Sequence, residues 1–175
     1  TGFLSSLPYL VMTAVLHLSG FTSDFVLAKR YCTTTCVRKV CVCIGFLFQA
    51  IFTVSVGYTT SVDTAVILLI FGVGMGGLVW SGFSVNIIDI GPRYSGLLMG
   101  ISNCIATVPG IAGPPIAGVL TPNETVAEWR SVFYISGGIS LLGCIVFGLL
   151  ATGVKQEWND SQYKVVPSSP VNLSD

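Results

Sequence analysis

Five long stretches of this sequence contain no charged side chain. They cover residues 1–23, 40–62, 64–88, 94–123 and 131–154, and all sixteen Asp, Glu, Lys and Arg residues lie outside them. A helix needs about 20 apolar residues to cross the hydrocarbon core of a bilayer, so each stretch is long enough for one crossing. The pattern predicts an all-α, multi-pass membrane protein with five transmembrane helices.

The composition indicates that the main partner of the chain is a lipid bilayer. Of the 175 residues, 52% are hydrophobic and 9% are charged, and the mean hydropathy is +0.81. A soluble domain carries about 25% charged residues. The formal net charge is zero, whereas a nucleic-acid-binding protein presents a basic patch. We therefore exclude a soluble enzyme, a nucleic-acid partner and a wholly disordered chain.

The charged segments also predict the organisation of the chain. We expect a transmembrane domain over residues 1–154 and a polar, disordered tail over residues 155–175. The expected helices cover about residues 3–23, 38–60, 64–89, 94–120 and 130–152. Because the sequence opens at Thr1 with an apolar segment and no signal-peptide pattern, we expect it to be a fragment of a longer protein.

Basic residues predict the orientation of the helices. Cytoplasmic loops of membrane proteins keep Lys and Arg. If the chain crosses five times, one side holds seven basic residues and the other holds only Arg130. The seven are Lys29, Arg30, Arg38, Lys39, Arg93, Lys155 and Lys164. This places the C-terminus in the cytoplasm and Asn123 on the opposite side, where the triplet Asn123-Glu124-Thr125 is a candidate glycosylation site.

Four of the six cysteines cluster between residues 32 and 43. They are Cys32, Cys36, Cys41 and Cys43, while Cys104 and Cys144 lie apart. Reduced, unligated thiols are the simplest interpretation in a reducing compartment, and acylation of Cys32 or Cys36 beside the membrane is the alternative. The spacing lacks the paired motifs of a zinc site. With no paired carboxylates or His/Cys/Asp cluster at catalytic spacing, we expect neither a metal site nor an enzyme.

A few polar residues interrupt the apolar stretches and are candidate pathway residues, because polar groups inside a membrane usually serve a function. They include Ser84, Asn86, Ser102, Asn103 and Thr107. His17 and Asp89 are candidate proton sites, because histidine changes charge near neutral pH and carboxylates occur in proton relays. For His17 a structural hydrogen bond is the alternative.

Small residues predict close helix packing in the third and fourth stretches. Gly72 with Gly76, and Gly96 with Gly100, fit the small-x-x-x-small pattern that lets two helix backbones approach. In the fourth stretch one stripe is formed by Gly96, Gly100, Asn103, Thr107, Gly110 and Pro114. The prolines at 109, 114 and 115 weaken the backbone hydrogen bonds of this helix, so we expect it to be the broken one.

The loop after the first stretch carries Gly20, Asp24, Lys29 and Arg30. This spacing resembles the G-x-x-x-D-x-x-x-x-[K/R]-[K/R] loop of the major facilitator superfamily. Other strings are similar to the organic-anion and phosphate transporter family, which includes sialin, the vesicular glutamate transporters and the type I sodium–phosphate cotransporters. These strings are Leu4–Leu10, Ser81–Asn86, Gly100–Asn103, Glu128-Trp129 and Gly153–Trp158.

The resemblance covers residues 2–158 and implies helices eight to twelve of a twelve-helix transporter, most of its C-terminal half. It implies a secondary active transporter, in the plasma membrane or an acidic organelle, that moves an organic or inorganic anion. Na⁺ or H⁺ would be the coupling ion and no other cofactor is implied. The N-terminal half, which carries several substrate-contacting Arg and Tyr residues in the family, would be the missing partner.

Residue roles follow from the same resemblance. Ser84, Asn86, Ser102, Asn103 and Thr107 would bind substrate. Gly20, Asp24, Lys29 and Arg30 would gate the cytoplasmic face, although Lys29 and Arg30 alone would also set the topology. One departure is Asn86-Ile87-Ile88-Asp89, where many relatives have Asn-His-Leu-Asp, so a proton-coupled mechanism does not carry over directly. A non-transporting receptor or scaffold with the same fold is the alternative function.

Overall fold

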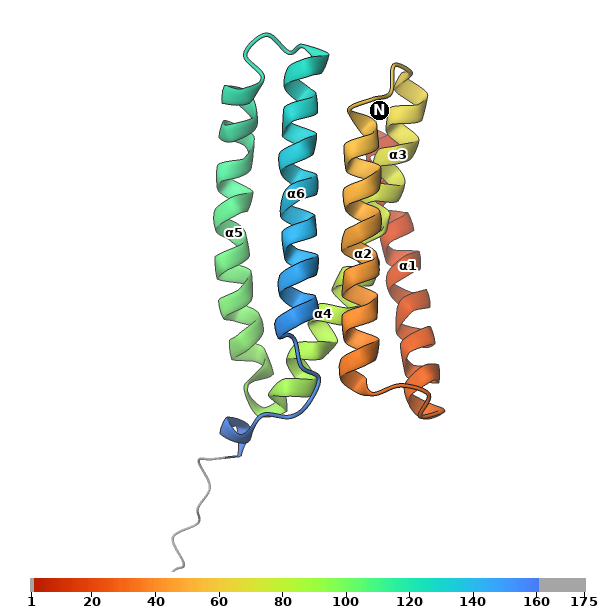
Figure 1. Cartoon of the computed structure of the whole chain (residues 1–175), viewed down its shortest axis with the longest axis vertical. Helices are drawn as coiled ribbons and strands as arrows, with labels where there is room; N and C mark the ends of the chain where they lie inside the picture. Colours follow the sequence, from red (N-terminus) through yellow and green to blue (C-terminus); the bar gives the residue numbers. More distant parts are fainter. Residues whose placement is uncertain (1, 161–175) are drawn as a thin grey trace, which may run out of the picture.

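The computed structural model describes residues 2–160, which form a bundle of helices (Figure 1). The helices are α1 (Gly2–Ala28), α2 (Thr34–Val56), α3 (Val62–Gly74), α4 (Gly76–Ile90), α5 (Ser95–Leu120) and α6 (Val126–Leu150), with short 3-10 turns η1 (Pro92–Tyr94) and η2 (Glu157–Asn159). Five spans are long and apolar enough to cross a membrane, because α3 and α4 together make one span, Val62–Ile90. The predicted all-α multi-pass architecture is confirmed.

Side-chain caps explain where several helices begin. The Thr33 hydroxyl accepts a hydrogen bond from Cys36 N at the start of α2, and the Ser61 hydroxyl accepts one from Thr64 N at the start of α3. At the start of α6, Thr125 and Glu128 form a reciprocal capping box, in which each side chain binds the backbone N–H of the other. Such caps satisfy amide groups that have no partner within the helix.

Helix α2 lies at the centre of one side of the bundle, where it packs against α6, α4, α3 and α1. Helix α5 stands at the outer edge, beside α6 and joined to the end of α4 (Figure 1). None of the residues of α5 is buried. The described chain therefore leaves a whole membrane-spanning helix without a packed face.

The structure corrects the expected position of the broken helix. The span expected as one helix over 64–89 divides at Met75, which lies between Gly74 and Gly76 and separates α3 from α4. The helix with the prolines, α5, is continuous despite Pro109, Pro114 and Pro115. Glycine is a poor helix former, so the run Gly72, Gly74, Gly76 and Gly77 is enough to interrupt a helix. Transmembrane helices, in contrast, accommodate proline through local adjustment.

The glycines at which two helix backbones pack closely are not those that the sequence analysis predicted. A Cβ atom on Gly77 would meet Met12 O and Leu16 N of α1, and one on Gly82 would lie 3.1 Å from Arg38 O of α2. By contrast, a Cβ on Gly76, Gly96 or Gly100 would meet nothing within 4 Å among residues 2–160. The expected contacts at these three glycines are absent from the described structure, and the small-residue stripe of α5 lies open.

Candidate functional site

A cavity of about 510 Å³ lies between α1 and α4. Six residues of α1 and four of α4 line it: Met12, Leu16, His17, Gly20, Phe21, Asp24, Trp80, Ser81, Ser84 and Val85. The α1 residues recur at intervals of three or four, as one helix face requires. Four residues predicted from the sequence, His17, Gly20, Asp24 and Ser84, are thus brought together. None of the lining residues is Lys or Arg.

His17 and Ser84 offer unused polar atoms to this cavity. His17 Nδ1 lies 2.8 Å from Thr13 O, and a carbonyl only accepts, so Nδ1 is the donor. In the neutral ring this leaves Nε2 as an acceptor. Within residues 2–160 the hydroxyl of Ser84 has no hydrogen-bond partner. The cavity therefore presents a hydroxyl donor and an imidazole side by side with apolar surface.

A buried polar joint that the sequence analysis missed holds the two walls together. The Ser19 hydroxyl of α1 donates to the Ser81 hydroxyl of α4 over 3.0 Å. Cys41 Sγ of α2 lies 3.5 Å from Ser23 Oγ and 3.8 Å from Ser19 Oγ. The signal was present as two small hydroxyl residues one turn apart, which commonly form interhelical hydrogen bonds in membranes.

An ion pair joins α2 to α4 outside the cavity lining. Arg38 Nε donates to Asp89 Oδ2 at 2.8 Å, and the Arg38 side chain is 6% exposed. Asp89, one of the two candidate proton sites, thus has a structural partner that sequence reasoning did not identify. The two residues are 51 positions apart, so no local pattern could have paired them.

Asn86 does not join Ser84 in the cavity. It is 7% exposed, and its Oδ1 atom has no hydrogen-bond partner among the described residues. It lies one turn beyond Gly82, on the side of α4 that packs against α2. Ser84 and Asn86 are two residues apart, which places them on opposite sides of a helix. An unpaired buried amide oxygen is costly, so this atom marks a place for a partner group.

The gating motif is divided between the cavity and the loop. Gly20 and Asp24 line the cavity, while Lys29 and Arg30 lie past the end of α1. Lys29 Nζ lies 5.8 Å from the centre of the Phe25 ring. Arg30 has a φ of 56°, where the chain turns toward α2. Within residues 2–160 neither cation forms an ion pair with an acidic side chain.

The substrate candidates of α5 lie away from this cavity. Asn103 and Thr107 are exposed and Ser102 is half-buried. The Thr107 hydroxyl donates to Asn103 O at 2.8 Å, within the helix. Asn103 and Thr107 belong to the open small-residue stripe, and neither they nor Ser102 line the cavity that holds His17 and Ser84.

The glycosylation candidate Asn123 lies in the exposed loop between α5 and α6. Its Nδ2 atom donates to Glu128 Oε1 at 3.0 Å, and its backbone N–H donates to Glu128 Oε2 at 3.2 Å. The loop is thus tied to the capping box of α6. The side-chain amide of Asn123 lies on the surface of the protein, as glycosylation requires.

The first six residues of the predicted tail, 155–160, are described by the structure and lie against the ends of the helices. Gly153 N donates to Thr35 Oγ1, Gln156 N to Ile90 O, and Arg93 N to Asn159 Oδ1, so residues 153–159 are bound to the ends of α2 and α4 and to η1. Lys155 Nζ lies 2.8 Å from Asp160 Oδ2. That ammonium, with a further hydrogen bond from Asn159, lowers the pKa of Asp160. The rest of the expected tail lies outside the described residues.

The cysteines and acidic residues do not gather into a metal site within the described range. No group of three His, Cys, Asp or Glu side chains is close enough to hold an ion among residues 2–160. Cys43 and Cys144 face one another across α2 and α6, where each thiol donates to the carbonyl of the other residue. Cys32 and Cys36 are exposed.

Comparison with known proteins gives matches along almost the whole chain. The family model of the Major Facilitator Superfamily matches residues 1–174. Sialin of Homo sapiens is 46% identical over 158 residues, which are 90% of this chain and 32% of sialin. Vesicular glutamate transporter 2.2 of Danio rerio is 42% identical over 161 residues, 92% of this chain and 27% of that protein. Vesicular glutamate transporter 1 of Xenopus laevis is 42% identical over 161 residues, which are 92% of this chain and 28% of that protein. The chain spans about a third or less of the length of these curated relatives.

Proposed function

Because the chain belongs to the major facilitator superfamily, we propose that it forms five of the six C-terminal helices of a secondary active transporter for an organic or inorganic anion. The similarity to sialin and to proteins named vesicular glutamate transporters supports an anionic substrate. The coupling ion in this proposal is Na⁺ or H⁺, and the membrane is the plasma membrane or that of an acidic vesicle or organelle.

The α1/α4 cavity is the observation that carries the proposal. It is lined by residues of two membrane spans, and its polar lining includes the hydroxyl of Ser84, the imidazole of His17 and the carboxylate of Asp24, but no Lys or Arg. Neutral donors suit one side of an anion, provided that cations meet the negative charge from the other side. Those cations belong to the N-terminal half, which is the missing partner in this proposal. Ser84 would donate its hydroxyl hydrogen to the anion.

The open face of α5 supports the presence of that partner. Asn103, Thr107 and the neighbouring glycines form a polar and narrow stripe that no other described helix covers. Small residues permit close helix approach, and polar residues in lipid need partners. In the proposal, the rest of the transporter covers this stripe and Asn103 and Thr107 then face the substrate path.

Alternating access would proceed by rocking of the two halves about the central site. In this scheme, Asp24, Lys29 and Arg30 act at the cytoplasmic face. Since Lys29 and Arg30 have no acidic partner in the described structure, they are free to pair with acidic groups of the other half in one of the two conformations. His17 faces the cavity and is the candidate group for proton coupling, and Asp89 is the second candidate.

The proposal is tested by measuring anion uptake into liposomes that contain the purified full-length protein. We expect accumulation of labelled phosphate, sialate or an acidic amino acid when a Na⁺ or H⁺ gradient is imposed. Ser84→Ala should lower this uptake, whereas the control Ser131→Ala, on an exposed part of α6, should leave it unchanged. If none of these anions accumulates under either gradient, the receptor or scaffold function is favoured instead.

A further inference from the structure

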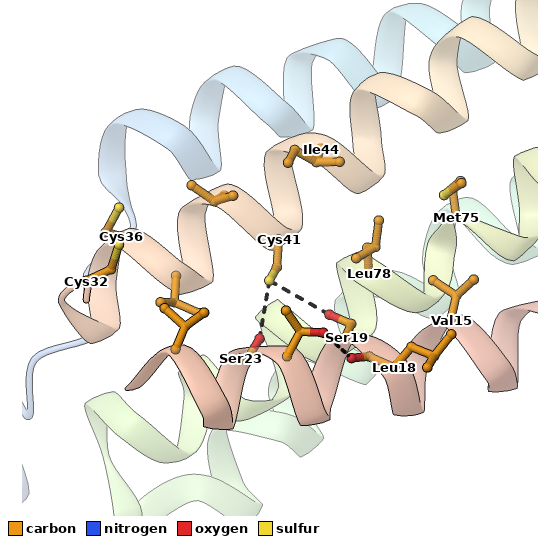
Figure 2. Close-up of a pocket in the computed structure, with 14 residues that line it drawn as sticks. Val15, Leu18, Ser19, Ser23, Cys32, Cys36, Cys41, Ile44, Met75 and Leu78 are labelled. Carbon is orange, nitrogen blue, oxygen red and sulfur yellow. Dashed lines mark hydrogen bonds between the residues drawn. The ribbon is translucent and has the colours of Figure 1, made fainter. Parts of the chain in front are cut away.

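A second cavity, of about 540 Å³, is shown in Figure 2. The residues of α1 that line it are all different from those that line the first cavity. It is a groove between α1 and α2 with the start of α4 as its floor. Its walls are mainly the apolar side chains of Val15, Leu18, Val26, Val40, Ile44 and Leu78. The two cavities differ in chemistry: His17, Asp24 and Ser84 line the first, while the second is lined mainly by aliphatic side chains, with three thiols and three hydroxyls and no ionisable His, Asp, Glu, Lys or Arg.

Two exposed thiols lie at one end of this groove. Cys32 is in the loop between α1 and α2, and Cys36 is in the first turn of α2. Cys36, Val40 and Ile44 all line the groove at four-residue intervals, so they share one face of α2. Figure 2 shows the thiols at one end and Val15 and Met75 at the other. From Cys36 to Ile44 the helix rises about 12 Å.

The surroundings indicate what enters the groove. Lys29, Arg30 and Lys39 flank the thiols in the sequence, and basic residues beside a membrane span favour the level of the lipid headgroups. The other end lies inside the apolar span. An apolar groove that runs from the headgroup level into the membrane suits a hydrocarbon chain. A thiol at its mouth, on the same helix face as its wall, provides a covalent attachment point.

We propose that Cys36 carries a long-chain fatty acyl group in thioester linkage, and that the acyl chain lies in the α1/α2 groove. The Cys36 sulfur attacks the carbonyl carbon of an acyl-coenzyme A thioester. A new carbon–sulfur bond forms, the bond to coenzyme A breaks, and the thiol proton passes to the coenzyme A thiolate. No oxidant or reductant is needed. The proposal is independent of the substrate that the protein transports.

Acyl exchange on the protein from eukaryotic membranes tests the attachment. Free thiols are blocked with N-ethylmaleimide, thioesters are cleaved with neutral hydroxylamine, and the released thiols receive a polyethylene glycol maleimide. We expect one hydroxylamine-dependent mass shift in the unaltered protein. Cys36→Ser should abolish it, and Cys32→Ser and Cys104→Ser should keep it. The absence of the shift, or its persistence in Cys36→Ser, overturns the proposal.

Thermal unfolding of the purified protein in detergent tests whether the acyl chain lies in the groove. If the acyl chain fills the groove, hydroxylamine lowers the unfolding temperature of the unaltered protein by several degrees and leaves that of Cys36→Ser unchanged. Val40→Trp fills the same groove from α2 without altering the thiol, so hydroxylamine should have little effect on it. Equal unfolding temperatures before and after hydroxylamine in the unaltered protein would show that the chain lies in bulk lipid, which overturns the groove assignment.

Discussion

Arg38 and Asp89 form an ion pair that joins the start of α2 to the end of α4, with 2.8 Å between Nε and Oδ2. The Arg38 side chain is 6% exposed and that of Asp89 is 22% exposed. Gly82 lies on the same side of α4 and packs against Arg38 O and Val42 of α2. The pair therefore closes an interface that is already tightly packed, at the end of the bundle that carries the basic loop.

Removal of one member of this pair should destabilise the fold. We expect Arg38→Ala to lower the free energy of unfolding by about 3–5 kcal/mol, because it leaves a partly buried carboxylate without its partner. The double variant Arg38→Met with Asp89→Leu should recover much of this loss, because neither charge remains. Thermal unfolding in detergent measures both. Lys39→Ala is the control, and a loss as large as that of Arg38→Ala would contradict this account.

Adjacent glycines should respond differently to alanine. Gly77→Ala places a Cβ against the backbone of Met12 and Leu16, which should cost about 1–3 kcal/mol through overpacking. In Gly76→Ala the added Cβ meets nothing within 4 Å in the described part of the chain, and alanine is a better helix former than glycine by about 1 kcal/mol. Unfolding temperatures of the two variants in detergent make the comparison. An equal fall in unfolding temperature for both variants would show that the break between α3 and α4, rather than close packing against α1, requires glycine at these positions.

The imidazole of His17 should affect coupling more than folding. We expect His17→Gln to reduce uptake driven by a proton gradient at least tenfold, because the cavity then lacks its one histidine. Anion exchange without a gradient should persist, since Ser84 remains. Uptake into proteoliposomes, with and without the gradient, separates the two. Unchanged proton-driven uptake in His17→Gln would assign coupling to another group, with Asp89→Asn as the next variant.

Glycosylation offers a test of orientation. If the α5–α6 loop faces away from the cytoplasm, the protein from eukaryotic membranes should lose mass on treatment with peptide N-glycosidase, and Asn123→Gln should abolish this change. Asn159→Gln should not, because Asn159 lies on the predicted cytoplasmic side and its side chain binds Arg93 N. A glycan on Asn159 would reverse the proposed orientation.

The number of spans followed from the charges because a charged residue inside a bilayer is expensive. The family followed from Gly20, Asp24, Lys29 and Arg30 and from several longer strings, and it is confirmed by the family-model match. The caps at Ser61 and Thr125 are local side-chain contacts, but the sequence analysis did not identify them, and its helices begin at about 64 and 130 rather than at Val62 and Val126. These features depend on neighbouring residues, or on residue type alone.

Other features depend on which helix faces meet. The sequence analysis predicts the same role for Ser84 and Asn86, but in the structure Ser84 lines the cavity and Asn86 is buried on the side of α4 that faces α2. Gly76 and Gly77 are likewise adjacent in the sequence, yet among the described residues only Gly77 packs closely against α1. The Arg38–Asp89 pair connects residues that only the fold brings together. For Asn103 and Thr107 the relevant neighbours are not among the described residues, so their role remains a prediction of the sequence.

The most direct test of the central claim is the accessibility of Ser84. The variant Ser84→Cys, in a transporter whose native cysteines, including the six of this chain, are all replaced by serine, places one thiol in the α1/α4 cavity. We predict that a charged, water-soluble methanethiosulfonate reagent blocks anion uptake by this variant, and that the transported anion slows the reaction. Full uptake after treatment with this reagent, with the introduced thiol shown to be labelled, would contradict the assignment of this cavity to the transport path.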